Sequence, residues 1–187
     1  MRGAETDEVL YQRFLSERDE EALRILLERH RNGLTLFLYG MIHDMDEAED
    51  LMIDAFAEAA SRSHWAPGGS SFKTWLFAIG RKKALMYLRK HRTAVLPLDE
   101  NRADAAALPE AEMLREERNR ELYLGLQRLP EDYREALTLL YFEQMPHEEA
   151  AKVMGKTRKQ MYHLANRGRE RLRDVLKEMG FDYAQYE

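Results

Sequence analysis

The stretch HEEAAKVMGKTRKQMYHLANRGRERL, residues 147–172, has the spacing of two short helices joined by a tight turn. Ala151 lies four residues before Gly155, so a small residue stands where two helices would touch and a glycine where the chain must turn with positive φ. Thr157 is placed to cap a second helix. The apolar residues of that helix recur at helical steps: Met161, Leu164 and Ala165. This pattern predicts a helix-turn-helix.

The opposite face of the second helix is basic. Residues 152–177 hold nine Lys or Arg against two acids, in a chain whose net charge is -5. A solvated basic helix of an ordinary bundle would share this charge, but it would not require the turn and the cap. We therefore expect the face to bind DNA. Its polar residues are Arg158, Lys159, Tyr162, His163, Asn166 and Arg167.

The composition of all 187 residues favours an all-α protein, because five Pro, ten Gly and no alternating β-branched runs leave little sequence for a sheet. No apolar run approaches the roughly 20 residues of a membrane span. Zero Cys and the absence of a signal-peptide apolar region lead us to expect a cytoplasmic protein. The six His lack metal-ligand spacing, and phosphate-binding glycine loops and nucleophile turns are absent. We expect no metal, no cofactor and no catalytic residue.

Three helices are expected in the first part of the chain: Thr6 to Leu15, Glu20 to about Ile42, and Asp46 to about Arg62. The third has six acids and no base between residues 44 and 54. A solvated helix face and a docking site for a basic protein surface explain these acids equally well.

A glycine-containing loop, residues 65–71, precedes a fourth expected helix from Phe72 to about His91. That helix begins with Phe72 and Trp75 and then carries bases without acids, so it is a candidate for binding single-stranded DNA. The alternative is that its apolar residues form core. We interpret Leu85 and Leu88 as core.

Residues 93–113 predict a flexible linker between an N-terminal domain, 1–92, and a C-terminal domain, 114–187. The C-terminal domain should contain helices from about Glu110 to Leu129 and from Glu131 to Gln144, followed by the helix-turn-helix. Residues 93–117 hold two bases and seven acids. This acidic segment is tethered to two basic patches, residues 81–92 and 152–177. We therefore expect it to compete with DNA phosphates for both patches.

Three segments in this order resemble the extracytoplasmic-function (ECF) sigma factors, group 4 of the bacterial sigma-70 family. DEAEDLMIDAF, residues 46–56, is similar to the polymerase-binding helix of that family, and SFKTWLFAIGRKKALMYLRKHR, residues 71–92, to its minus-ten helix. LPEDYREALTLLYFEQMPHEEAAKVMG, residues 129–155, with the basic helix after it is similar to the minus-thirty-five domain. The resemblance implies a non-enzymatic initiation factor that binds the β′ clamp and β flap of RNA polymerase core, promoter DNA and an anti-sigma factor.

The resemblance also implies site residues. For polymerase they are Asp46, Glu49, Asp50, Asp54 and Phe56. For the minus-ten element they are Trp65, Gly69, Ser70, Ser71, Phe72, Trp75, Arg81, Lys82 and Arg89. For the minus-thirty-five element they are Thr157, Arg158, Lys159, Tyr162, His163, Asn166 and Arg167.

The chain departs from the family pattern at three positions. Lys82 and Met86 stand where the family commonly has Asn and Asp, and Ala150 replaces a larger aliphatic residue. The alternative function is a helix-turn-helix regulator that acts without polymerase. It would leave the acidic third helix and the basic fourth helix unexplained.

Overall fold

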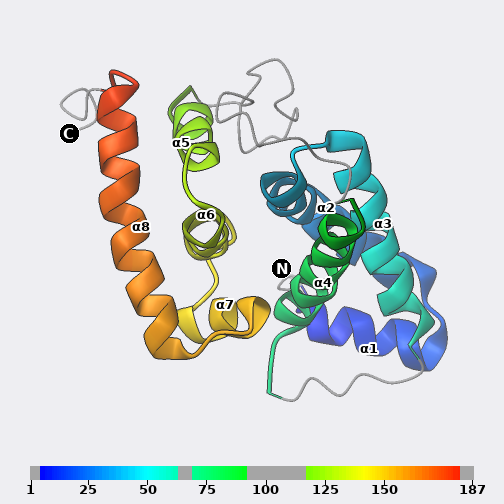
Figure 1. The fold of residues 1–187 in the computed structure, drawn as a ribbon. Helices are drawn as coiled ribbons and strands as arrows, with labels where there is room; N and C mark the ends of the chain where they lie inside the picture. The colour runs from blue at the N-terminus through cyan, green and yellow to red at the C-terminus, as the bar shows by residue number, and fades with distance from the viewer. Residues whose placement is uncertain (1–4, 63–68, 92–116, 182–187) are drawn as a thin grey trace.

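The computed structural model describes residues 5–62, 69–91 and 117–181, and all regular structure in these residues is helical (Figure 1). This confirms the all-α prediction. The N-terminal domain contains α1 (Asp7–Glu17), α2 (Glu20–Ile42), α3 (Met45–Ser61) and α4 (Phe72–His91). The C-terminal domain contains α5 (Glu117–Gln127), α6 (Glu131–Leu137), the π-helical turn η3 (Thr138–Phe142), α7 (His147–Met154) and α8 (Arg158–Glu178). No helix in these ranges is long and apolar enough to cross a membrane.

Side-chain caps fix where the helices begin. Asp19 Oδ1 accepts hydrogen bonds from the backbone N–H groups of Glu21 at 3.1 Å and Ala22 at 3.2 Å, and so starts α2. Ser71 Oγ accepts from the N–H of Thr74 at 3.2 Å and caps α4 in the same way. These short-range bonds explain why α2 and α4 begin at the residues expected from the sequence.

The helix expected from Glu131 to Gln144 has a different form. It changes at Thr138 from α6 into the wider turn η3, and the Glu143 N–H donates to the Thr138 carbonyl at 3.0 Å, five residues back. Gln144 then has a φ of 53°. The extra residue in the turn rotates Glu143 away from the surface, and its side chain is 7% exposed.

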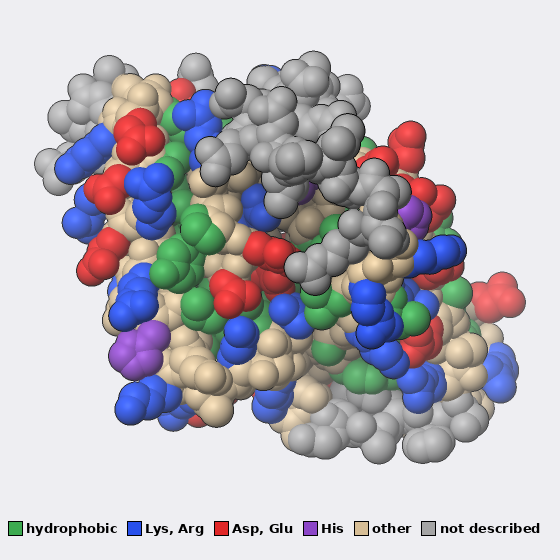
Figure 2. Space-filling view, viewed as in Figure 1, with side chains coloured by type: hydrophobic (Ala, Val, Ile, Leu, Met, Phe, Trp, Pro, Cys, Tyr) green, Lys and Arg blue, Asp and Glu red, His purple; other side chains and the backbone are tan. Residues whose placement is uncertain are grey.

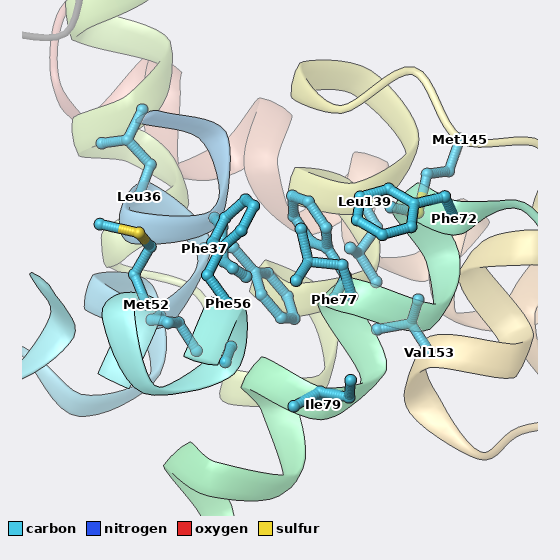
Figure 3. Close-up of a cluster of buried hydrophobic side chains, with 14 of the residues drawn as sticks. Leu36, Phe37, Met52, Phe56, Phe72, Phe77, Ile79, Leu139, Met145 and Val153 are labelled. Carbon is cyan, nitrogen blue, oxygen red and sulfur yellow. The ribbon is translucent and has the colours of Figure 1, made fainter. Parts of the chain in front are cut away.

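The two domains pack against each other and share one apolar core. In Figure 3, Phe72 and Phe77 of α4 lie beside Leu139, Met145 and Val153 of the C-terminal domain. All five side chains are at most 5% exposed. This core joins the two domains, and a second apolar cluster lies within the C-terminal domain: Leu126, Leu129, Leu137 and Val175. The predicted linker, residues 93–113, lies wholly outside the described residues.

Two helices of the C-terminal domain have contrasting positions. The short helix α7 lies against α4, whereas α8 runs along the far side of the molecule from the N-terminal domain (Figure 1). A hydrogen bond of 3.2 Å joins the buried Tyr123 hydroxyl of α5 to the Leu36 carbonyl of α2. The C-terminal domain therefore contacts the N-terminal domain through α5, α6, η3 and α7, and leaves α8 open to solvent.

Candidate nucleic-acid interface

The helix-turn-helix has the predicted turn. Gly155 ends α7 with a φ of 62°, and the Lys156 N–H donates to the Ala151 carbonyl at 2.9 Å. Thr157 then starts α8 with a capping box: its Oγ1 accepts from the Gln160 N–H at 3.2 Å, and its own N–H donates to Gln160 Oε1 at 2.8 Å. Met161 is fully buried. The turn, the cap and the burial of Met161 fix the direction in which α8 leaves α7.

The polar face of α8 is exposed along its length. Figure 2 shows Lys and Arg side chains on the side of the molecule that α8 occupies. A face of this kind, on the second helix of a helix-turn-helix, suits the major groove of DNA. The six side chains expected to face DNA are all exposed: Arg158, Lys159, Tyr162, His163, Asn166 and Arg167.

Contacts from α7 hold the start of this face in place. Glu148 forms an ion pair of 2.8 Å with Arg158. The Arg158 guanidinium also lies 5.6 Å from the centre of the Tyr162 ring. The His147 ring stacks on the same Tyr162 ring, with centroids 4.2 Å apart and an interplanar angle of 15°. His147 and Glu148 were not among the site residues predicted from the sequence, although both lie on the first helix of the predicted motif.

The second basic surface lies on α4, beside α7. Lys82 and Arg89 are exposed, and they line a groove together with Lys152 of α7. Leu85 and Met86 also line it and are 38% and 51% exposed. The interpretation of Leu85 as core was wrong. The buried stripe of α4 passes through Ala84, and the next residue is rotated by about 100° out of the core.

Several predicted minus-ten residues lie in other surroundings. The Phe72 ring is fully buried, with its centroid 4.8 Å from the Tyr11 ring, so it is part of the core and its predicted stacking on a base is corrected. Trp75 is half-buried against the same Tyr11 ring. Gly69 is exposed with a φ of 80°, and Ser70 and Ser71 are half-buried. Trp65 lies outside the described residues.

Arg81 is the least exposed of the basic residues predicted to contact DNA. Its side chain is 16% exposed, and its Nε donates at 2.6 Å to Glu135, a residue of α6 that is 2% exposed. Burial raises the pKa of the Glu135 carboxyl, and the hydrogen bond and charge of Arg81 oppose that rise. Arg81 is therefore satisfied by the C-terminal domain where DNA was expected.

The acids of α3 form a continuous exposed face. Asp46, Glu49, Asp50 and Asp54 are exposed. Ile53, which was not among the predicted site residues, is 57% exposed among them. Phe56 is 7% exposed and belongs to the core, which corrects its predicted place on this surface. An acidic face with an apolar centre fits a basic protein surface better than DNA. No cluster of metal-binding side chains occurs among the residues that the structure describes.

Two family models match the chain in the order expected from the resemblance. The model described as Sigma-70 region 2 matches residues 26–94, and the model described as Sigma-70, region 4 matches residues 119–172. The first range includes the acidic face of α3 and the bases of α4. The second includes the helix-turn-helix.

Whole-chain comparisons agree with these matches. The chain is 30% identical over 161 residues to the RNA polymerase sigma-H factor of Pseudomonas aeruginosa, with 80% of this chain and 83% of that protein covered. It is 30% identical over 160 residues to the ECF RNA polymerase sigma-E factor of Escherichia coli, with the same two shares covered.

The fold is also similar to that of the sigma factor RpoE in its co-crystal structure with the anti-sigma factor NepR from Bartonella quintana. The TM-score is 0.62 at 24% identity, and the match covers 82% of this chain and 96% of RpoE. The sequence matches place region 2 on most of α2 with α3 and α4, and region 4 on α5 to most of α8. The chain belongs to the ECF RNA polymerase sigma factors of the sigma-70 family, non-enzymatic initiation factors that direct RNA polymerase to promoters.

Proposed function

We propose that this sigma factor contacts its partners through three surfaces. The acidic face of α3 binds the β′ clamp of RNA polymerase, residues 65–71 with α4 open and read the minus-ten element, and α8 reads the minus-thirty-five element. The domains are 1–92 and 114–187, with 93–113 as the linker, and the C-terminal domain also binds the β flap. The protein acts in the cytoplasm, where polymerase and chromosomal DNA are present.

The observation that carries this proposal is the exposed polar face of α8, held by contacts from α7 on a helix-turn-helix turn. The basic residues Lys82 and Arg89 on α4 give the N-terminal domain a second, separate surface for phosphates. A promoter factor that reads two elements needs two such surfaces on different domains. A regulator that used only the helix-turn-helix would need neither α4 nor α3.

An anti-sigma factor is also part of the proposal. RpoE of Bartonella quintana, to which this fold is similar, was crystallised in complex with the anti-sigma factor NepR. We infer that a protein of the same class binds this chain and controls its access to polymerase.

The α3 assignment predicts a loss of polymerase binding on charge reversal. Asp50→Lys with Asp54→Lys should weaken binding to core polymerase by about tenfold or more, because the exchange places like charges opposite a basic surface. The loss should be smaller at high salt. Folding should be nearly unchanged because exposed charges contribute little to stability. The measurement is a titration of labelled protein with purified core polymerase.

The matched control is Glu17→Lys with Glu20→Lys, which reverses two exposed acids of α1 and α2. It should bind core polymerase as the parent does. Equal affinity of the parent and the Asp50, Asp54 double variant would remove the α3 face from the interface. Failure of the parent itself to bind core polymerase in this titration would instead favour the regulator that acts without polymerase.

A further inference from the structure

Four side chains at the start of the helix-turn-helix form one connected group on its surface. Glu148 of α7 pairs with Nη1 of Arg158 on α8 at 2.8 Å. The Arg158 guanidinium lies over the Tyr162 ring, and the half-buried His147 ring stacks on that same ring. Two neighbouring residues of α7 thus contact two residues that lie one turn apart on α8.

The stability of the fold does not account for the ion pair. The side chains of Arg158 and Glu148 are both 62% exposed, and a pair so exposed contributes little to folding. An arginine on a helix surface would otherwise sample many rotamers, and the carboxylate and the Tyr162 ring restrict them. A donor that is restricted before it binds loses less entropy when a ligand arrives.

The carboxylate also decides which ligand the guanidinium suits. Glu148 places a negative charge beside Arg158, and this charge repels a phosphate. The edge of a base carries no net charge, so the same carboxylate does not oppose its binding. Arg158 is therefore better suited to a base than to the DNA backbone, and its place at the first residue of α8 is where a recognition helix reaches base edges.

The geometry of the pair selects one base. The guanidinium is a planar fork of N–H donors, and Glu148 binds it at Nη1. The opposite edge, formed by Nε and Nη2, has no second acid paired with it among the described residues. Two parallel donors match the N7 and O6 acceptors of guanine in the major groove, whereas adenine offers one acceptor and one donor there.

We propose that Glu148 and His147 are positioning residues that hold Arg158 for a guanine of the minus-thirty-five element. Glu148 fixes one side of the guanidinium and repels phosphate. His147 holds the Tyr162 ring, over which the guanidinium lies. Neither α7 residue contacts the base in this role, which rests on the proposed function of α8 and adds to it the base that Arg158 reads.

The first test is base selection by holoenzyme assembled from the full chain and core polymerase. The probe is a pool of duplexes that are randomised over the minus-thirty-five region and joined to a pre-opened bubble, and the bound fraction is sequenced. The parent should prefer guanine at one position by about tenfold or more, and Arg158→Ala should remove that preference.

The outcomes separate this inference from the proposed function. A parent that prefers another base at the position that depends on Arg158 overturns the guanine assignment. Selection that survives Arg158→Ala at every position overturns it too, while α8 remains a reader of the element. A parent that binds the pool with no preference in this region refutes the proposed function of α8 as well.

Glu148→Gln should change two measurements in opposite directions. The guanine preference should fall by about fivefold, because the guanidinium is no longer held. Binding to a duplex of unrelated sequence should tighten by about twofold, because a negative charge leaves the DNA-binding surface. A defect in folding would weaken both. An unchanged guanine preference overturns the role of Glu148, and a change at a different base pair would make it a direct base reader instead.

Glu170→Gln is the matched control. It removes the same charge from another exposed residue of α8, about 18 Å further along the helix at about 1.5 Å per residue. The guanine preference should stay at the level of the parent. Loss of the preference in Glu170→Gln to the same degree would assign the effect to net charge and overturn the positioning role.

Two substitutions test the stacked ring. His147→Ala should lower the guanine preference by about threefold, whereas His147→Phe keeps an aromatic ring against Tyr162 and should retain the preference. Retention of the preference in both variants would remove His147 from the role. Loss in both would mean that the imidazole acts through a contact of its own and not through the stack.

A measurement on the free chain tests the positioning without DNA. In nitrogen-15 NMR spectra, the Nε–H signal of Arg158, identified by its loss in Arg158→Lys, should report a more restricted side chain in the parent than in Glu148→Gln. The signal in Glu170→Gln should match the parent. Equal mobility in the parent and Glu148→Gln overturns the positioning role whatever the selection shows, and this result does not depend on the proposed function.

Discussion

Replacement of Phe77 by alanine should cost the folded protein about 3 to 5 kcal/mol, the range for removal of a fully buried aromatic ring from a core. Phe77 is 0% exposed, and its ring centroid lies 5.6 Å from that of Phe37 on α2. It also belongs to the core that joins the two domains. The loss is a large part of the roughly 5 to 15 kcal/mol by which domains of this kind are stable.

The measurement is urea denaturation followed by far-ultraviolet circular dichroism. Leu85→Ala, eight residues further along the same helix, serves as the control because Leu85 is 38% exposed. Its effect should stay within about 0.5 kcal/mol, as for most surface positions. Comparable losses in the two variants would mean that α4 presents a different face to the core.

Arg158→Ala should remove roughly 1 to 3 kcal/mol of discrimination at one base pair of the minus-thirty-five element, which is the value of a side chain that reads a base edge. Arg158 is at the start of α8, exposed, and held by Glu148 and Tyr162. The N-terminal residues of a recognition helix are those that reach base edges. Run-off transcription from promoters carrying each of the four bases at every minus-thirty-five position would measure the loss.

Lys159→Ala provides the comparison. Lys159 is the next residue of α8 and is also exposed. None of the contacts that the structure shows fixes the orientation of its side chain. It should weaken all promoter variants by a similar factor and lower the salt dependence of binding by about one unit. If Arg158→Ala also weakened all promoters equally, Arg158 would be a phosphate contact and a different part of α8 would read the sequence.

The candidate surfaces were predicted to different degrees. The face of α8 follows from a 3.6-residue period, so its six polar residues could be selected from the sequence and all are exposed. On α4 the period is less informative because apolar residues occur on several sides of the helix. Phe72, expected to stack on a base, is core, and Leu85, expected in the core, is exposed. The positions of α1, α2, α3 and α7 decide which sides of α4 are covered.

Local sequence was enough to determine the bounds of α2 and α4, the turn at Gly155 and the sign of charge on each surface. These depend on interactions within about four residues, such as the bonds of Asp19 to Glu21 and Ala22. The tertiary structure alone decided that Arg81 pairs with Glu135, 54 positions away, and that the Lys73 ammonium binds Glu143, 70 positions away. No local pattern encodes such a pair, because it forms only when two separate helices, each already folded, exclude water from the space between them.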